Sequence, residues 1–312
     1  MKVVALAGGV GAGKFLRGLI RAVPPADVTA VVNTGDDLDM HGLRVCPDLD
    51  SVTYWLGDAF DRERGWGRRE ETFRATEELG RFDPEAAWFG LGDLDLATHL
   101  FRTRSLNEGL ALSEVTVRIA ARFDITSTIL PMSDQRVETR LDVVALGQEL
   151  DLHLQEYWVG RRARDDVKAI RFEGVTTASP APGVMHAIEE ADAIVICPSN
   201  PVVSIGPILA LGGMREAVAA RPVVGISPIV GGRPLAGMAD RLMPVVGLEV
   251  SAAGAARAYE DLLDAWVIDD ADARLADRVR DEVGARVAVT DTVMRDDEIA
   301  ERLARAALAA LA

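Results

Sequence analysis

A short apolar run that ends in a cluster of glycines is the feature that most constrains the fold of this chain. The run spans residues 2–7, the glycines lie within 8–13, and apolar residues then recur at helical spacing from Phe15 onward. The next strand is predicted at 28–32. A strand, a glycine turn, a helix and a second strand begin a parallel, doubly wound sheet, so we predict a Rossmann-like α/β fold.

The rest of the chain alternates strands and helices, with one interval rich in helix formers. Residues 55–123 are predicted to be a mainly helical insertion. Further strands are predicted at 125–130, 137–144, 151–159, 193–197, 222–226, 266–269 and 287–290. Polar and apolar residues alternate after Asp151, which is typical of an antiparallel or edge strand. No linker divides the chain, so we predict a single domain over residues 1–312, ending in a helix from about Asp297.

Composition limits the classes of protein that this chain can be. The 312 residues are 49% hydrophobic, enough for a sizeable core, yet no stretch approaches the ~18 uncharged apolar residues of a membrane span. The net charge of −15 argues against nonspecific nucleic-acid binding. Two distant cysteines, Cys46 and Cys197, do not suggest a disulfide framework or a zinc site, and the first residues do not form a secretory signal. We expect a cytoplasmic protein.

The glycine cluster predicts a phosphate-binding turn. Glycines let the backbone present its N–H groups to an anion, and the following helix adds a positive N-terminus. The spacing matches G-x-x-x-x-G-K, but Phe15 stands where a P-loop NTPase has the Ser or Thr that holds Mg²⁺, which disfavours that class. A tight turn without a ligand is the alternative. The candidate diphosphate-binding residues are Gly8, Gly9, Gly11, Gly13 and Lys14.

Polar side chains follow the second predicted strand, at the end of a doubly wound sheet that faces ligands. Asn33 and Thr34 can hydrogen-bond a ribose or a phosphate, and Asp36 or Asp37 can bind a metal ion or a hydroxyl group. Acidic loop residues are more often solvated or helix caps. Their proximity to a phosphate turn nevertheless favours a site for a divalent cation.

Two further acidic segments and one proline-rich loop are candidates for substrate binding. The segment PDLD carries Asp48 and Asp50, and GDLDLATH carries Asp93, Asp95 and His99, with His99 four residues after Asp95 on a predicted helix. The alternative for the second segment is a capping aspartate paired with a histidine. A rigid loop after the strand at 193–197 offers hydrogen-bonding groups for a base or sugar, although turn chemistry explains them too; they are Ser199, Asn200 and Ser204.

Taken together, these segments resemble the 2-phospho-L-lactate transferase family of coenzyme F-420 biosynthesis. The resemblance covers nearly the whole chain, and seven matches in chain order are more specific than any single one. They are GGVGAGK at 8–14, VVNTGDD at 31–37, PDLDSV at 47–52, GDLDLATH at 92–99, ILPMSD at 129–134, PSNPVVSIGPIL at 198–209 and SPIVGG at 227–232.

The resemblance implies a homodimeric enzyme that uses Mg²⁺. The acceptor would be 7,8-didemethyl-8-hydroxy-5-deazariboflavin, called the deazaflavin alcohol below. Its ribityl 5′-hydroxyl would attack the phosphorus that bears a lactyl or enolpyruvyl group in a guanosine diphospho donor, and GMP would leave. Lysine is rare among the basic residues, as in GC-rich actinobacterial coding, and actinobacterial relatives are associated with the enolpyruvyl donor.

The resemblance also assigns roles to matching residues. The glycine turn would hold the diphosphate, and Ser199, Asn200 and Ser204 would seat the guanosine. The deazaflavin side would be lined by Asp48, Asp50, Asp93, Asp95 and His99. A carboxylate would orient the attacking hydroxyl or bind Mg²⁺; the candidates are Asp36, Asp37 and Asp50, with Asp36 and Asp37 as metal ligands. The family often has basic residues where this chain has Leu94 and Leu96, so a cationic contact there cannot be carried over.

Two other classes of function remain as alternatives. YvcK-like proteins resemble this family at the glycine turn but bind nucleotide sugars as regulators, and the PDLD, GDLDLATH and SNPVVSIGP segments favour the transferase over them. An ordinary nucleoside triphosphatase is disfavoured by Phe15.

Overall fold

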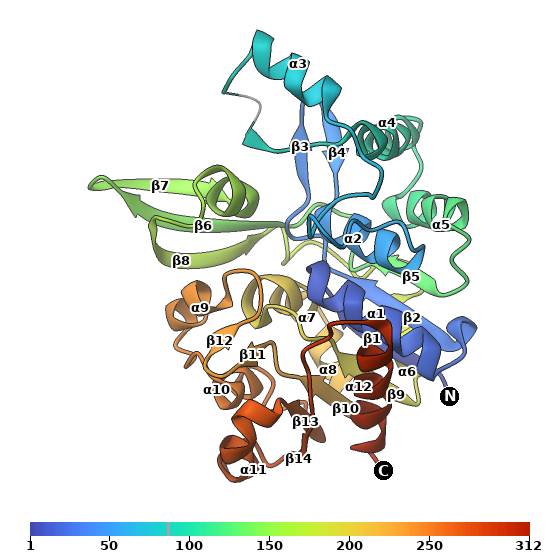
Figure 1. The fold of residues 1–312 in the computed structure, drawn as a ribbon, viewed down its shortest axis with the longest axis vertical. Helices are drawn as coiled ribbons and strands as arrows, with labels where there is room; N and C mark the ends of the chain where they lie inside the picture. Colours follow the sequence, from blue (N-terminus) through green and yellow to red (C-terminus); the bar gives the residue numbers. More distant parts are fainter. Residues whose placement is uncertain (86–87) are drawn as a thin grey trace.

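Seven parallel strands form the central sheet of the computed structural model, which describes residues 1–85 and 88–312 (Figure 1). Their order across the sheet is β14-β13-β10-β9-β1-β2-β5, and every neighbouring pair is parallel. The strands are β1 Val3–Ala7, β2 Val28–Val32, β5 Thr128–Pro131, β9 Ala193–Ile196, β10 Val223–Ile226, β13 Ala265–Ile268 and β14 Arg286–Val289. The predicted Rossmann-like α/β fold is confirmed.

The residues of β1 explain why the sheet is covered on both faces. All five are apolar and buried; Val4 and Leu6 join one core cluster, whereas Val3, Ala5 and Ala7 join the other. Successive side chains of a strand point to opposite faces, so an apolar strand needs cover on both sides.

The α-helices are α1 Gly9–Ala22, α2 Pro47–Leu56, α3 Arg74–Phe82, α4 Asp93–Asn107, α5 Leu112–Arg122, α6 Val184–Glu189, α7 Gly206–Ala210, α8 Met214–Ala219, α9 Ala239–Leu242, α10 Ala252–Arg257, α11 Ala276–Val283 and α12 Asp297–Ala309.

Helix α1 is held between α12 and α2. Gly18 permits the close approach to α12, because a Cβ atom at this position would collide with the backbone of Ala300. On its other side α1 packs against α2, the helix that carries Asp48 and Asp50. The N-terminus of α1 is therefore fixed next to the PDLD segment.

The interval 55–123 contains α3, α4 and α5, besides the end of α2; its residues 86–87 lie outside the described part of the chain. A short antiparallel hairpin before it, formed by β3 Leu38–Met40 and β4 Leu43–Val45, was not predicted. Its strands have three residues each, too few for a periodic pattern to be read. The hairpin lies beside α4, with α3 beyond it (Figure 1).

A separate three-stranded antiparallel sheet confirms the strand predicted at 137–144 and the antiparallel edge strand predicted near Asp151, and it adds a strand that was not predicted. It consists of β6 Glu138–Ala145, β7 Gln148–His153 and β8 Asp166–Glu173, in the order β7-β6-β8, and extends away from the central sheet (Figure 1). The strand predicted at 151–159 ends at His153, and Glu156–Gly160 forms a π-helical turn instead. Strand β8 was missed because half of its residues are polar and none of its eight residues is buried. Within the described residues, no helix has the length and apolar character needed to cross a membrane.

Candidate functional site

The candidate site lies where β1, β2 and β9 end. Strand β1 has β2 on one side and β9 on the other, so the order of the strands reverses between β1 and β9. In open α/β sheets this reversal creates a crevice outside the carboxyl ends of the strands, where ligands bind. The segments that follow these strands are the glycine turn, residues 33–37 and residues 198–204, which contain most of the predicted nucleotide-binding residues.

The glycine turn is tightly packed, and α1 starts at Gly9 directly after it. At Gly8 a Cβ atom would lie 2.6 Å from Ser204 Cβ and 2.7 Å from Asp48 Oδ2. The Ser199 hydroxyl donates to the Gly8 carbonyl at 2.8 Å, and the Gly8 amide donates to Ser199 Oγ at 3.4 Å. The polar groups of Gly8 are thus engaged within the protein. The amides that can face a ligand belong to the first turn of α1, where a helix leaves its N–H groups without helical partners.

Asp48 places its carboxylate at the N-terminus of α1. The Gly9 amide and the Asn33 side-chain amide both donate to it, the latter at 2.9 Å. Asn33 also donates to Asp36 at 3.3 Å, and Gln155 donates to the other oxygen of Asp36 at 2.9 Å. Burial raises the pKa of Asp48 to about 7, and burial together with the neighbouring Asp48 and Asp37 raises the pKa of Asp36 well above its ordinary value. Two buried carboxyl groups, bridged by the Asn33 side chain, therefore meet at this point.

Asp37 contacts other partners, one on β4 and one directly after it. Its carboxylate accepts from the Cys46 thiol at 3.0 Å and pairs with the Arg44 guanidinium at 3.3 Å, while Oδ1 is buried without a hydrogen-bond partner. Burial raises the pKa of Asp37 to about 6, against the lowering effect of Arg44. The Thr34 hydroxyl is likewise buried and unpaired. The two predicted metal ligands, Asp36 and Asp37, thus turn to different neighbours.

Asp50 forms a buried ion pair that sequence reasoning missed. Both terminal nitrogens of Arg102 donate to its carboxylate, one of them at 3.1 Å, and Arg102 is only 2% exposed. Burial alone would lower the pKa of Arg102, but pairing with Asp50 outweighs this effect and the pKa is raised. His99 Nδ1 lies 3.2 Å from Arg102 Nη1, and burial lowers the pKa of His99 to about 4, so the imidazole is neutral at pH 7.

The signal that reveals Arg102 is a polar stripe on α4. The buried face of this helix consists of polar residues at helical spacing, namely Asp95, Thr98, His99, Arg102 and Ser105. A buried helix face is usually apolar, so such a stripe marks a buried polar network. Arg102 continues the Asp95–His99 spacing by three residues, so the sequence carries this signal.

The remaining candidates on the acceptor side have different surroundings: some lie buried near Asp50, and one holds two helices together. Asp95 is buried near Asp50, its Oδ1 has no hydrogen-bond partner, and burial raises its pKa to about 7. Asp93 is half-buried and bonds Thr72 and the Ala75 amide at the start of α3, so it holds α3 onto α4. The structure therefore gives Asp93 a capping role and brings Asp95 and His99 to Asp50.

On the nucleotide side, Asn200 also makes a local contact. Its side chain accepts from the Val202 amide at 2.9 Å and so caps the π-helical turn Pro201–Ile205. Lys14 lies one turn into α1, with Nζ 6.0 Å from the centre of the Trp55 ring, and lines a small cavity of about 120 Å³ that also touches Val10 and Arg62. Gly11 and Gly13 lie within α1, where they let Pro198 and Trp55 pack closely.

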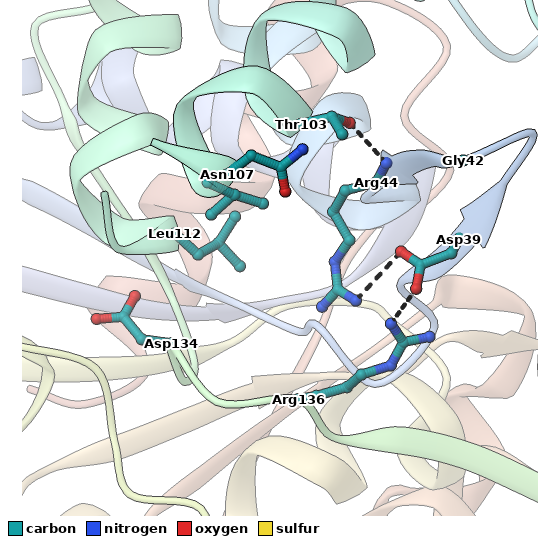
Figure 2. A pocket seen from close by; sticks show the side chains of 9 residues that line it. Asp39, Gly42, Arg44, Thr103, Asn107, Leu112, Asp134 and Arg136 are labelled. Carbon is teal, nitrogen blue, oxygen red and sulfur yellow. Dashed lines mark hydrogen bonds and ion pairs between the residues drawn. The ribbon is translucent and has the colours of Figure 1, made fainter. Parts of the chain in front are cut away.

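A larger cavity of about 460 Å³ opens at the β5 side of the sheet (Figure 2). Figure 2 shows the Arg44 and Arg136 side chains meeting at Asp39, with Asn107 and Leu112 facing them from the helices. Arg44 links this cavity to the site, because its guanidinium contacts Asp37 as well as Asp39. None of the cavity residues was predicted from the sequence.

Comparison with known proteins identifies the family. A family profile described as "2-phospho-L-lactate transferase CofD" matches residues 3–308. This chain belongs to the CofD family. A protein of Streptomyces griseus named phosphoenolpyruvate transferase is 50% identical over 99% of this chain and 98% of its own length. One of the same name from Mycolicibacterium smegmatis is 41% identical over 99% and 98%.

Structural comparison supports the fold independently. A crystal structure of a protein of the UPF0052 family from Bacillus halodurans superposes with a TM-score of 0.63, covering 98% of both chains at 16% identity. At this identity the likeness concerns the fold alone. The CofD family membership thus rests on the sequence matches.

Proposed function

We propose that this protein is a transferase of coenzyme F-420 biosynthesis that moves a phosphoenolpyruvyl group from a guanosine diphospho donor to the deazaflavin alcohol. One observation carries the proposal: in a chain of the CofD family, buried carboxyl groups converge at the N-terminus of α1, at the strand-order reversal where doubly wound sheets bind nucleotides. The 2-phospho-L-lactyl group is the alternative cargo. Full-length relatives named phosphoenolpyruvate transferase favour the enolpyruvyl group.

The donor would lie along the ends of β1 and β9. The amides at the first turn of α1 would face the diphosphate, and Lys14 would contribute a cation. Ser204 beside Gly8 would contact the guanosine side, while Ser199 and Asn200 hold the shape of the loop through their bonds to Gly8 and Val202.

Asp36 and Asp48 would hold a Mg²⁺ ion between the protein and the diphosphate. The residues fit this ion, because both supply carboxylate oxygens, Asn33 bridges the two carboxyl groups, and Asp48 lies at the N-terminus of α1. When bound, Mg²⁺ would neutralise charge on the phosphate oxygens. Asp37, predicted as the second ligand, would instead keep Arg44 in place. Among the described residues, no group of three or more His, Cys, Asp or Glu side chains forms a ready metal site.

Asp50 would orient the attacking hydroxyl group of the acceptor. Arg102 keeps its carboxylate fixed, and neutral His99 lies 3.7 Å from it. The hydroxyl oxygen forms a bond to the phosphorus that bears the enolpyruvyl group, the bond from this phosphorus to the bridging oxygen breaks, and GMP leaves with that oxygen. The hydroxyl proton passes to a carboxylate. Such reactions depend mostly on positioning and charge neutralisation.

Incubation of the protein with Mg²⁺, the deazaflavin alcohol and each guanosine diphospho donor tests the proposal, with products identified by mass. We expect GMP to appear only when the acceptor is present, together with the enolpyruvyl-phospho product. Hydrolysis of the donor at the same rate without acceptor would refute it. Relatives named as transferases match over their full length and so disfavour the regulator alternative. If the purified protein retained a nucleotide sugar and showed no turnover, the regulator alternative would be supported instead.

A further inference from the structure

We propose that Gln155 is a positioning residue for Asp36: its side-chain amide fixes the Asp36 carboxylate so that this group and Asp48 can hold one divalent cation together. The inference rests on the proposed function, in which these two carboxylates hold Mg²⁺. Gln155 was not among the residues predicted from the sequence. It lies outside the central sheet, shortly after β7 of the antiparallel sheet.

The antiparallel sheet contacts three consecutive residues of the loop that follows β2, although most of it extends away from the central sheet (Figure 1). A backbone amide near the start of β6 donates to the Gly35 carbonyl. The Gln155 side chain donates to Asp36 Oδ2 at 2.9 Å. The ring of His153, the last residue of β7, contacts the Asp37 carbonyl through Nε2 at 3.2 Å. The loop is therefore held from a second sheet as well as by its own strand.

The His153 ring is fixed in one tautomer. The Gln155 backbone amide donates to His153 Nδ1 at 3.1 Å, so Nδ1 carries no proton, and Nε2 carries the proton that it donates to the Asp37 carbonyl. Burial lowers the pKa of His153, in agreement with a neutral ring. The ring thus ties the backbone of Gln155 to the loop, which restricts where the Gln155 side chain can lie.

Apolar neighbours anchor the same segment in the core. Leu154 and Tyr157 lie on either side of Gln155 in the chain, and both belong to the core cluster that includes Val4. Gln155 itself is only 7% exposed. A buried amide requires hydrogen-bond partners, and the Asp36 carboxylate is one of them. The segment therefore cannot turn Gln155 towards water without removing apolar side chains from the core.

The two oxygens of Asp36 are held with different strength. Oδ1 lies 3.3 Å from the Asn33 side-chain nitrogen, which also contacts Asp48 at 2.9 Å and the Val203 carbonyl at 3.3 Å. An amide nitrogen has two protons, so these three acceptors share them. The 2.9 Å bond from Gln155 to Oδ2 is therefore the stronger restraint on the Asp36 carboxylate.

This arrangement matches the general design of metal sites, in which neighbouring donors orient the ligands. With Oδ2 bonded to Gln155, Oδ1 stays on the side that shares the Asn33 nitrogen with Asp48. Without Gln155 the carboxylate would be free to rotate about its Cβ–Cγ bond. Removing such an outer partner of a metal ligand typically weakens metal binding about 10–100-fold.

The variant Gln155→Met tests the role, because it keeps a side chain of similar length and removes the amide. Gln148→Met is the matched control, since it makes the same substitution at the exposed first residue of β7. Binding of Mn²⁺, which replaces Mg²⁺ as a spectroscopic probe, is measured from the electron paramagnetic resonance signal of the free ion. The protein is measured with and without GDP and always without acceptor, so that no turnover is needed.

We expect Gln155→Met to weaken Mn²⁺ binding about tenfold or more. Gln148→Met should stay within about twofold of wild type, because surface substitutions have small effects. In an Asp36→Asn background, Gln155→Met should change Mn²⁺ binding by less than about twofold, because Gln155 acts through Asp36. If circular dichroism shows that Gln155→Met is unfolded, Gln155→Asn replaces it with the same expectations, since its amide is one methylene too short to reach Asp36.

Steady-state kinetics separates positioning from general damage to the fold. In Gln155→Met the Mg²⁺ concentration for half-maximal turnover should rise about tenfold or more, while kcat at saturating Mg²⁺ and the acceptor KM stay near the wild-type values. A purely structural role would instead lower kcat at every Mg²⁺ concentration, and that result would overturn the inference.

The remaining outcomes distinguish this inference from the proposed function. Unchanged Mn²⁺ binding in Gln155→Met, an equal loss in the wild-type and Asp36→Asn backgrounds, or a wild type that binds no Mn²⁺ would each overturn the positioning role, even in an active transferase. A wild type that loses Mn²⁺ binding on Gln155→Met only when Asp36 is present, but never releases GMP, would support the positioning role and refute the transferase.

Discussion

Removing the charge of Arg102 should destabilise the protein strongly, because the buried Asp50 carboxylate would lose its ion-pair partner. In Arg102→Met the side chain keeps a similar apolar stem but loses both bonds to Asp50 and the bond to the Arg44 carbonyl. Breaking a buried ion pair by removing one partner costs about 3–5 kcal/mol. With an unfolding entropy of about 2.1 cal/mol/K per residue over 312 residues, this lowers Tm by roughly 5–8 °C.

Urea unfolding followed by tryptophan fluorescence, at pH 7.5, measures the loss. Arg104→Met is the control, since Arg104 is exposed on the same helix and only 3.7 Å from an equally exposed Glu108; it should cost less than about 1 kcal/mol. The double variant Asp50→Asn/Arg102→Met should lose less than Arg102→Met alone, because no unpaired charge then remains. The reasoning is refuted if Arg102→Met costs no more than Arg104→Met, or if the double variant loses the sum of both single changes.

Three further changes test separate parts of the site. Asp95 has a folded-state pKa of about 7, above the ~3.9 of an unfolded chain, so wild-type stability falls as pH rises from about 4 to about 7. Asp95→Asn should therefore be more stable than wild type at pH 8, by up to roughly 4 kcal/mol, and equal to it below pH 4; a difference that does not change between these two pH values would contradict this. Lys14→Met should raise the donor KM about tenfold or more, whereas Lys2→Met, an exposed lysine paired with Glu190, should leave it unchanged, as steady-state kinetics can show. Asp36→Asn should raise the Mg²⁺ concentration for half-maximal turnover at least tenfold, and an unaltered Mg²⁺ titration would remove Asp36 from the metal site.

Sequence patterns predicted the central sheet well, because most of its strands are short apolar runs. The residues of β1, β9, β10 and β13 are all buried, and such runs between glycine and proline turns can be recognised without tertiary information. The antiparallel sheet was harder. The residues of β8 are mostly half-buried or exposed, and their pairing with β6 is set by contacts from distant parts of the chain.

The sequence indicated which acidic residues belong to the candidate site, but not which side chains they pair with. Asp36, Asp48 and Asp50 were recognised as acidic residues near a phosphate turn, yet the sequence could not show that Asn33 bonds the first two or that Arg102 pairs with the third. Arg102 lies 52 positions from Asp50, so no local rule relates them. The cavity beside β5 combines residues of a hairpin, two helices and a loop, and only the folded chain brings these together.

A crystal structure with GDP, Mg²⁺ and the deazaflavin alcohol bound together tests the central claim most directly. The account predicts the diphosphate at the first turn of α1, with Mg²⁺ held by Asp36 and Asp48. A nucleotide bound in the cavity beside β5, with the ends of β1 and β9 unoccupied, would contradict it.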